Sequence, residues 1–142
     1  MRPYSRTAGP RQPVSRYILD ASALLALLNE EEGAEVVIPL LPEAVISTVN
    51  LAEVVTRLAL AGMPEPAIRA TLALLPLDQV AFDDDQAIQT GLLAPATRTL
   101  GFSLGDRACL ALARLQEATV VTADQVWQML PLGIPVLVVR GS

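Results

Sequence analysis

The chain has 142 residues, of which 52% are hydrophobic but only 4% aromatic, so we expect one domain with an aliphatic core. It contains no histidine and one cysteine, which excludes an internal disulfide, a structural zinc site and histidine-based catalysis. Any chemistry must therefore come from carboxylates, hydroxyls, arginine or a metal bound by oxygen.

The charge is distributed unevenly along the chain. The net charge is -5, but four of the ten basic residues precede Tyr17, which leaves six arginines against fifteen acids, a balance of -9, in the rest. An acidic body of this kind repels nucleic acid at long range. Residues 1–16 lack an apolar period and the apolar centre of a secretory signal, so we predict a disordered basic arm. It is either an inert extension or a contact to a polyanion, and one domain over residues 17–142 follows it.

The mean hydropathy of +0.45 is high for a soluble chain. Pro, Asp or Glu interrupts every apolar run before it reaches 18 residues, so no transmembrane helix is expected. The apolar excess has two explanations of equal weight: a well-filled core, or an apolar surface that a partner or a second copy covers.

Short apolar runs alternate with helical patterns along the chain. In chain order, we predict a strand at Tyr17–Leu19, a helix at Ser22–Asn29 whose pattern resumes through Leu41, a strand at Ala44–Thr48, a helix from Asn50 to Gly62, a helix at Glu65–Leu75, a strand at Leu77–Phe82, a helix opened by Asp83 and interrupted near Pro95, a helix at Ser103–Gln116, a strand at Thr119–Thr122, a short helix at Gln125–Leu130 and a strand at Pro135–Val139. Strands separated by helices predict an α/β fold with a parallel sheet covered on both faces.

Four acids occupy comparable positions in this pattern. Asp20 ends the first strand, Glu53 lies in the first turn of the helix after the second strand, and Asp124 directly follows the fourth strand. In a parallel sheet these positions share one edge, where such folds bind their ligands. Asp106, in the first turn of its helix, joins them if that helix leads down to the fourth strand.

Each acid also has a purely structural explanation, because acids are favoured at the starts of helices. The candidate caps are Asp20 or Ser22, Thr122 or Asp124, and two capping boxes, Asn50 with Glu53 and Ser103 with Asp106. The run Asp83–Asp85 is interpreted as a solvated cap away from Asp20. Capping alone does not explain why four acids should share one sheet edge.

Converging carboxylates repel one another, and a divalent cation removes this repulsion. All-oxygen ligands suit Mg²⁺ or Mn²⁺. A metal held in this way orients a water and stabilises charge on a phosphoryl oxygen, which predicts hydrolysis of a phosphodiester. Ser22 and Thr122 are either hydroxyls that support the metal ligands or donate to phosphate, or plain helix caps.

Four motifs follow one another in the chain: Asp20-Ala-Ser22-Ala-Leu, Asn50-Leu-Ala-Glu53-Val, Gly105-Asp106-Arg107-Ala-Cys-Leu-Ala-Leu-Ala113 and Val121-Thr122-Ala-Asp124. In this order and at these separations they resemble the PIN-domain ribonucleases, most closely the VapC-type toxins of bacterial toxin–antitoxin pairs. The resemblance covers about residues 17–140. The chain departs from the family in its longer arm and in its few basic residues.

The resemblance implies a three-layer α/β/α fold with a five-stranded parallel sheet, and a cytoplasmic endoribonuclease that depends on Mg²⁺ or Mn²⁺. Asp20, Glu53, Asp106 and Asp124 match the acidic quartet, with Asn50 in a supporting position. The resemblance also implies a homodimer and an antitoxin segment that covers an apolar groove near the acids. Arg57 and Arg107 are candidates for phosphate contact, or else solvated or paired arginines.

Two other readings remain open. One is a phosphatase with Asp20 as nucleophile, although haloacid-dehalogenase-type phosphatases usually place a second Asp where this chain has Ser22. The other is a non-catalytic binding module in which the acids serve only as caps.

Overall fold

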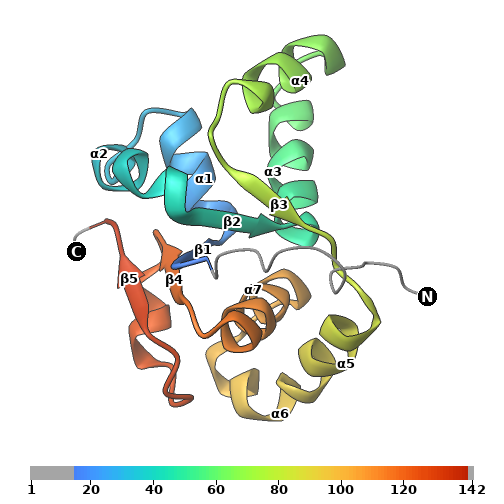
Figure 1. Cartoon of the computed structure of the whole chain (residues 1–142), viewed down its shortest axis with the longest axis vertical. Coiled ribbons are helices and arrows are strands. Elements are labelled where there is room, and N and C mark those ends of the chain that lie inside the picture. The colour runs from blue at the N-terminus through green and yellow to red at the C-terminus, as the bar shows by residue number, and fades with distance from the viewer. Residues whose placement is uncertain (1–14, 141–142) are drawn as a thin grey trace, which may run out of the picture.

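The computed structural model describes residues 15–140, which form three layers with a parallel sheet in the middle (Figure 1). The order of the five strands is β3-β2-β1-β4-β5, and every neighbouring pair is parallel. The strands are β1 (Tyr17–Leu19), β2 (Ala44–Ser47), β3 (Asp78–Val80), β4 (Thr119–Thr122) and β5 (Val136–Val138). The predicted three-layer fold is confirmed. Residues 1–14 of the predicted basic arm lie outside the described residues.

Helices cover both faces of the sheet. They are α1 (Ala21–Leu28), α2 (Ala34–Val37), η2 (Ile38–Glu43), α3 (Thr48–Leu60), α4 (Glu65–Ala73), α5 (Asp84–Leu92), α6 (Ala94–Thr97), η3 (Arg98–Leu100), α7 (Leu104–Gln116) and η4 (Gln125–Met129). Helices α1 to α4 lie on one side and α5 to α7 on the other (Figure 1). None of the helices within residues 15–140 is both long and apolar enough to cross a membrane.

The alternation of side chains along the strands produces two separate cores. Leu19, Ile46 and Val121 belong to the core that includes Leu24 of α1 and Val54 of α3. The preceding residue of each strand belongs to the core on the other face, with Leu110 of α7 and Trp127 of η4; these residues are Ile18, Val45 and Val120. Burial of aliphatic side chains on both faces is what stabilises a parallel sheet.

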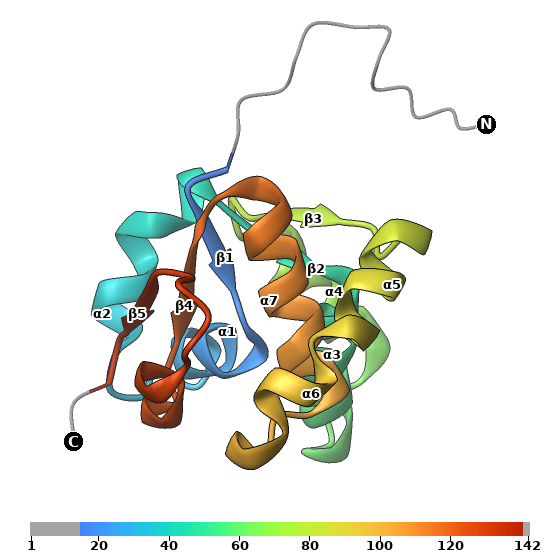
Figure 2. The same ribbon diagram turned by 90° about the horizontal axis from the view of Figure 1, so that it is seen from below.

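The carboxyl ends of the parallel strands lie at one edge of the sheet. Figure 2 shows β1 and β4 running side by side in the same direction, with α1 following β1 and η4 following β4 at that edge. Strand β3 lies at the border of the sheet, so the acids that follow it are separated from Asp20 by β2. Asp83 caps α5 by accepting a hydrogen bond from the Gln86 amide at 2.9 Å, and the interpretation of this run as an exposed cap is confirmed.

The start of α3 differs from the prediction. The helix begins at Thr48, and its N-cap is Ser47, whose hydroxyl accepts from the Val49 amide at 3.1 Å. The predicted capping box of Asn50 and Glu53 is therefore wrong, and Glu53 lies in the second helical turn. Since Ser47 satisfies the helix end, the Asn50 side chain is released for tertiary contacts.

Candidate metal and active site

Asp20 is the most buried of the four acids, with 4% of its surface exposed. It directly follows β1 and is the N-cap of α1, where its Oδ1 accepts from the Ala23 amide at 2.9 Å. The Ser22 hydroxyl donates to the same oxygen at 2.7 Å, and the Thr122 hydroxyl donates to Oδ2 at 2.5 Å. Contacts from α1 and β4 thus fix the orientation of this carboxylate.

The two hydroxyls also join Asp20 to Asp124. The Ser22 hydroxyl accepts from the Ala123 amide at 2.9 Å, and the Thr122 hydroxyl accepts from the Asp124 amide at 3.0 Å. The Oδ1 atom of Asp124 in turn accepts from the Val126 amide at 3.0 Å and caps η4. Ser22 and Thr122 therefore hold the end of β4 against the end of β1.

Burial raises the pKa of Asp20 to about 6, and the charge of Asp106 adds to the rise. Hydrogen bonds from Thr122, Ala23 and Ser22 act in the opposite direction, because they favour the ionised carboxylate. Desolvation outweighs these bonds. A cation bound nearby would stabilise the ionised form of this buried carboxylate.

Glu53 reaches the same edge through contacts between α3 and α7. The Asn50 side chain is 1% exposed, and its Nδ2 donates to Glu53 Oε1 at 2.9 Å and to the Gly105 carbonyl at 3.0 Å. A Cβ atom on Gly105 would lie 2.2 Å from Glu53 Oε2. The glycine therefore leaves the space in which this carboxylate lies.

Asp106 belongs to the predicted capping box, which the structure confirms. Its Oδ2 accepts from the Ser103 amide at 2.9 Å, and its own amide donates to the Ser103 hydroxyl at 3.2 Å. The box leaves Oδ1 of Asp106 available to another group. Burial raises the pKa of the Cys109 thiol in the next turn, and the charges of Asp20, Asp106 and Glu53 raise it further.

One pocket of about 390 Å³, here called the acid pocket, brings all four acids together. It is lined by Asp20, Glu53, Asp106 and Asp124 together with Ala21, Ser22, Leu25, Thr56 and Arg57. Within residues 15–140, no three acidic or cysteine side chains are already arranged around a single metal position. The chemistry of the donor set nevertheless fits Mg²⁺ or Mn²⁺, since the side chains in the pocket that can bind a cation, those of the four acids, Ser22 and Thr56, do so through oxygen.

The model of the PIN domain family matches residues 17–130 of the chain. The chain belongs to the PIN-domain family.

Solved structures with the same fold include three toxin–antitoxin complexes. DNA-bound VapBC from Salmonella typhimurium is 20% identical with a TM-score of 0.69, and the match covers 87% of this chain and 97% of the other. A toxin–antitoxin complex from Klebsiella pneumoniae is 20% identical with a TM-score of 0.68, covering 89% and 99%. VapBC-5 from Mycobacterium tuberculosis is 21% identical with a TM-score of 0.55, covering 91% and 100%. No curated protein sequence matches the chain.

The two arginines predicted near the acids of this PIN domain lie in different environments. Arg57 is on α3, one turn after Glu53, and lines the acid pocket. Arg107 donates from Nη1 to the Thr90 carbonyl of α5 at 3.0 Å and does not line the pocket. Arg107 therefore joins α7 to α5, and of these two arginines only Arg57 lines the acid pocket.

Gly105 is the residue of this PIN domain whose role the sequence analysis missed. Gly105 belongs to the third motif, and a glycine in the first turn of a helix is itself a signal, because it lowers helix propensity. Gly105 also takes part through its backbone, because its carbonyl accepts from the Asn50 Nδ2 that holds Glu53.

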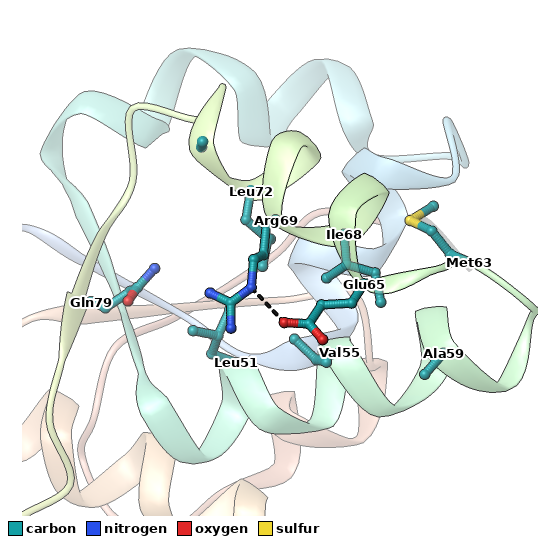
Figure 3. Close-up of a pocket in the computed structure, with 10 residues that line it drawn as sticks. Leu51, Val55, Ala59, Met63, Glu65, Ile68, Arg69, Leu72 and Gln79 are labelled. Carbon is teal, nitrogen blue, oxygen red and sulfur yellow. Dashed lines mark hydrogen bonds and ion pairs between the residues drawn. The ribbon is translucent and has the colours of Figure 1, made fainter.

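An apolar groove of this PIN domain is separate from the acids. It has a volume of about 650 Å³ and lies between α3 and α4, with apolar side chains such as Leu51, Val55 and Leu72 along its walls. Figure 3 shows the ion pair between Arg69 Nε and Glu65 Oε2, 2.8 Å apart, within the ring of residues that line this groove.

Proposed function

We propose that this protein is an endoribonuclease that hydrolyses RNA phosphodiester bonds with Mg²⁺ or Mn²⁺ and acts as the toxin of a toxin–antitoxin pair. The single observation that supports this proposal most is the acid pocket. Acids from four separate segments of a PIN-domain chain line one pocket at the carboxyl edge of the sheet. Such an edge is where open α/β sheets bind ligands.

In this proposal, Asp20, Glu53, Asp106 and Asp124 would hold the metal. A divalent ion bound there promotes ionisation of a water and stabilises charge on the phosphoryl oxygens. Asp20 is kept in place by Ser22 and Thr122, and Glu53 is kept in place by Asn50. Arg57, the positive side chain in the acid pocket, donates to the phosphate and offsets its charge.

Cleavage of RNA by the purified protein tests the proposal, with Asp83→Asn as a matched control for Asp106→Asn. Both acids accept a backbone hydrogen bond at a helix start, Asp83 as the N-cap of α5 and Asp106 at the third position of α7, and the amide oxygen of asparagine accepts such a bond as well. We expect Asp106→Asn to lose about 100-fold or more of the activity, EDTA to abolish it, and Asp83→Asn to retain it. Cleavage that survives both EDTA and Asp106→Asn would overturn the proposal.

Binding of Mn²⁺ separates this proposal from a non-catalytic module. If the acids serve only as caps, the affinity for Mn²⁺ is the same before and after Asp20→Asn. If Asp20 is a ligand, calorimetric titration shows the affinity falling in the variant, together with activity.

We also propose that an apolar helix of the antitoxin lies in the groove between α3 and α4. The apolar walls of this groove support this occupant, and so does the description of similar structures as toxin–antitoxin complexes. Ala59 lines the groove and is exposed, whereas Ala52 is exposed on the same helix outside it. We expect Ala59→Glu to weaken binding of a co-expressed antitoxin and Ala52→Glu to leave it unchanged.

A homodimer is the second proposed assembly. Ile88 and Leu92 of α5 are 60% and 66% exposed and lie one helical turn apart, so they form an apolar stripe that a second copy would cover. Light scattering should give twice the mass of the chain for the wild type and the mass of one chain for Leu92→Asp.

A further inference from the structure

A second pocket of about 470 Å³, here called the arginine pocket, adjoins the acid pocket along α1 and α3. Ser22, Leu25 and Arg57 line both pockets, so the two pockets are immediate neighbours. The residues that line only the arginine pocket include Arg140, Glu31 and Leu60. Its volume is within the range of sites that hold small organic ligands.

The two pockets differ in charge. Four acids and one arginine line the acid pocket, whereas two arginines and one glutamate line the arginine pocket. Of the seven arginines within residues 15–140, only Arg57 and Arg140 line either pocket. Among the others, Arg16 and Arg69 pair with glutamates of their own, and Arg107 donates to a carbonyl. Within residues 15–140, Arg57 and Arg140 are therefore the positive side chains that a polyanion would contact beside the acids.

Arg140 lies where its guanidinium can exchange a glutamate for a phosphate. It follows β5, so it lies at the same carboxyl edge of the sheet as the acids. Its Nη2 pairs with Glu31 Oε1 at 2.9 Å, and its Nε donates to the Glu32 carbonyl at 3.4 Å. The paired side chains are 35% and 49% exposed, and ion pairs of such exposure contribute little to stability. A phosphate can therefore replace Glu31 at small cost.

We infer that the arginine pocket binds the nucleotide next to the scissile phosphate, with Arg140 donating to the phosphate of that nucleotide and Arg57, which lines both pockets, keeping its proposed contact with the scissile phosphate. The inference rests on the proposed function, because it requires RNA in the acid pocket. Guanidinium groups bind phosphate by two parallel hydrogen bonds. Leu25 and Leu60 supply an apolar wall beside them for the sugar or the base.

Glu31 then acts as a competitor for Arg140. In the free protein it occupies the guanidinium, and bound RNA must displace it. This arrangement predicts effects of opposite sign: loss of Arg140 weakens RNA binding, whereas loss of the Glu31 charge strengthens it. Removing one charge from any arginine–glutamate ion pair on the surface would change the RNA affinity with the same signs. A second ion pair, distant from the pockets, is therefore needed as a control. Glu65 and Arg69 form such a pair on α4, outside both pockets.

Fluorescence anisotropy of a labelled twelve-nucleotide oligouridylate tests the inference, with Mg²⁺ present and Asp106→Asn as the background that prevents cleavage. We expect Arg140→Ala to lower the affinity about 5- to 10-fold at low salt and to reduce the slope of log affinity against log salt by about 0.7, the value for one phosphate contact on a single strand. Arg140→Lys retains the slope. Glu31→Gln raises the affinity about 2- to 5-fold, while Arg69→Ala and Glu65→Gln change it less than 2-fold. Thermal melting verifies that each variant is folded.

The outcomes separate the inference from the proposed function. If the wild type cleaves RNA but Arg140→Ala and Arg69→Ala bind with equal affinity and equal salt slope, the inference is wrong and the proposed function stands. If Arg140→Ala weakens binding of an antitoxin but not of RNA, the pocket is a protein contact and the inference is again wrong. If the wild type neither cleaves nor binds RNA, both fail.

Discussion

The buried carboxylate of Asp20 makes the stability of the metal-free protein depend on pH. Its pKa is raised from the ordinary value of 3.8 to about 6, mainly by burial. Because the folded-state pKa lies above the unfolded-state value, the folded state binds the proton more tightly. The contribution of this group to stability is therefore fully present below pH 3.8 and is lost as the pH rises through about 6.

The size of the effect follows from the two pKa values. The whole difference corresponds to about 3 kcal/mol, and about 1.4 kcal/mol of it is lost between pH 5 and pH 7.5. Other carboxylates also titrate in this range, so the wild type must be compared with Asp20→Asn. Asparagine keeps the cap on α1 but carries no charge.

Urea unfolding in EDTA at the two pH values measures this difference. We expect the free energy of unfolding of Asp20→Asn to gain about 1.4 kcal/mol relative to the wild type between pH 5 and pH 7.5. Adding Mn²⁺ at pH 7.5 should then stabilise the wild type by about 2.7 kcal/mol at a concentration of 100 times Kd, and the variant by much less. Parallel pH profiles for the two proteins would show that Asp20 is not desolvated as the structure indicates.

Three further changes test other parts of the site and the fold. Gly105→Ala should lower RNA cleavage, since the new methyl group displaces the Glu53 carboxylate. It should leave the melting temperature within a few degrees of the wild type, because a gain in helix propensity of up to ~1 kcal/mol offsets part of the lost packing between Gly105 and Glu53. Trp127→Ala should cost about 3–5 kcal/mol in urea unfolding, because the indole is 1% exposed, and the same change at the 69% exposed Met129 should cost less than 1 kcal/mol. Arg57→Ala should reduce cleavage without shifting the melting temperature, whereas Arg114→Ala, which lies outside both pockets, should change neither.

The sequence was sufficient to predict where the strands and most of the helices lie, because period and turn residues are local signals. Asp20 follows a short buried strand as expected, and of the two candidate caps, Asp20 and Ser22, it is the one that caps the next helix. The capping box of Ser103 and Asp106 was also predicted correctly, since both partners lie within one helical turn. Local patterns of this kind determine which acids stand at the sheet edge.

The start of α3 could not be predicted from local pattern, because both Ser47 and Asn50 are good N-cap residues. The choice depends on a tertiary contact: the Asn50 amide donates to the Gly105 carbonyl, 55 residues later in the chain. The contact between Ser22 and Thr122, 100 residues apart, was likewise beyond local reasoning. The role of Arg140 could not be predicted from local pattern either, because only the folded chain brings it into the same pocket as Arg57.

Capping and metal binding are alternatives when the sequence is considered alone, but they are compatible in the folded protein. Asp20, Asp106 and Asp124 each accept a backbone hydrogen bond at a helix start, while Glu53 does not cap. A cap needs one carboxylate oxygen, and the second oxygen of Asp106 and of Asp124 remains for a cation. The backbone amides at these helix starts also reduce the repulsion among the acids when no metal is bound.

The contribution of an acid to helix capping can therefore be separated from the contribution of its charge by the choice of substitution. At Asp124, asparagine preserves the cap and removes the charge, whereas alanine also removes the cap and costs about 1 kcal/mol; equal losses of RNA cleavage in the two variants, with different melting temperatures, would assign the activity to the charge alone.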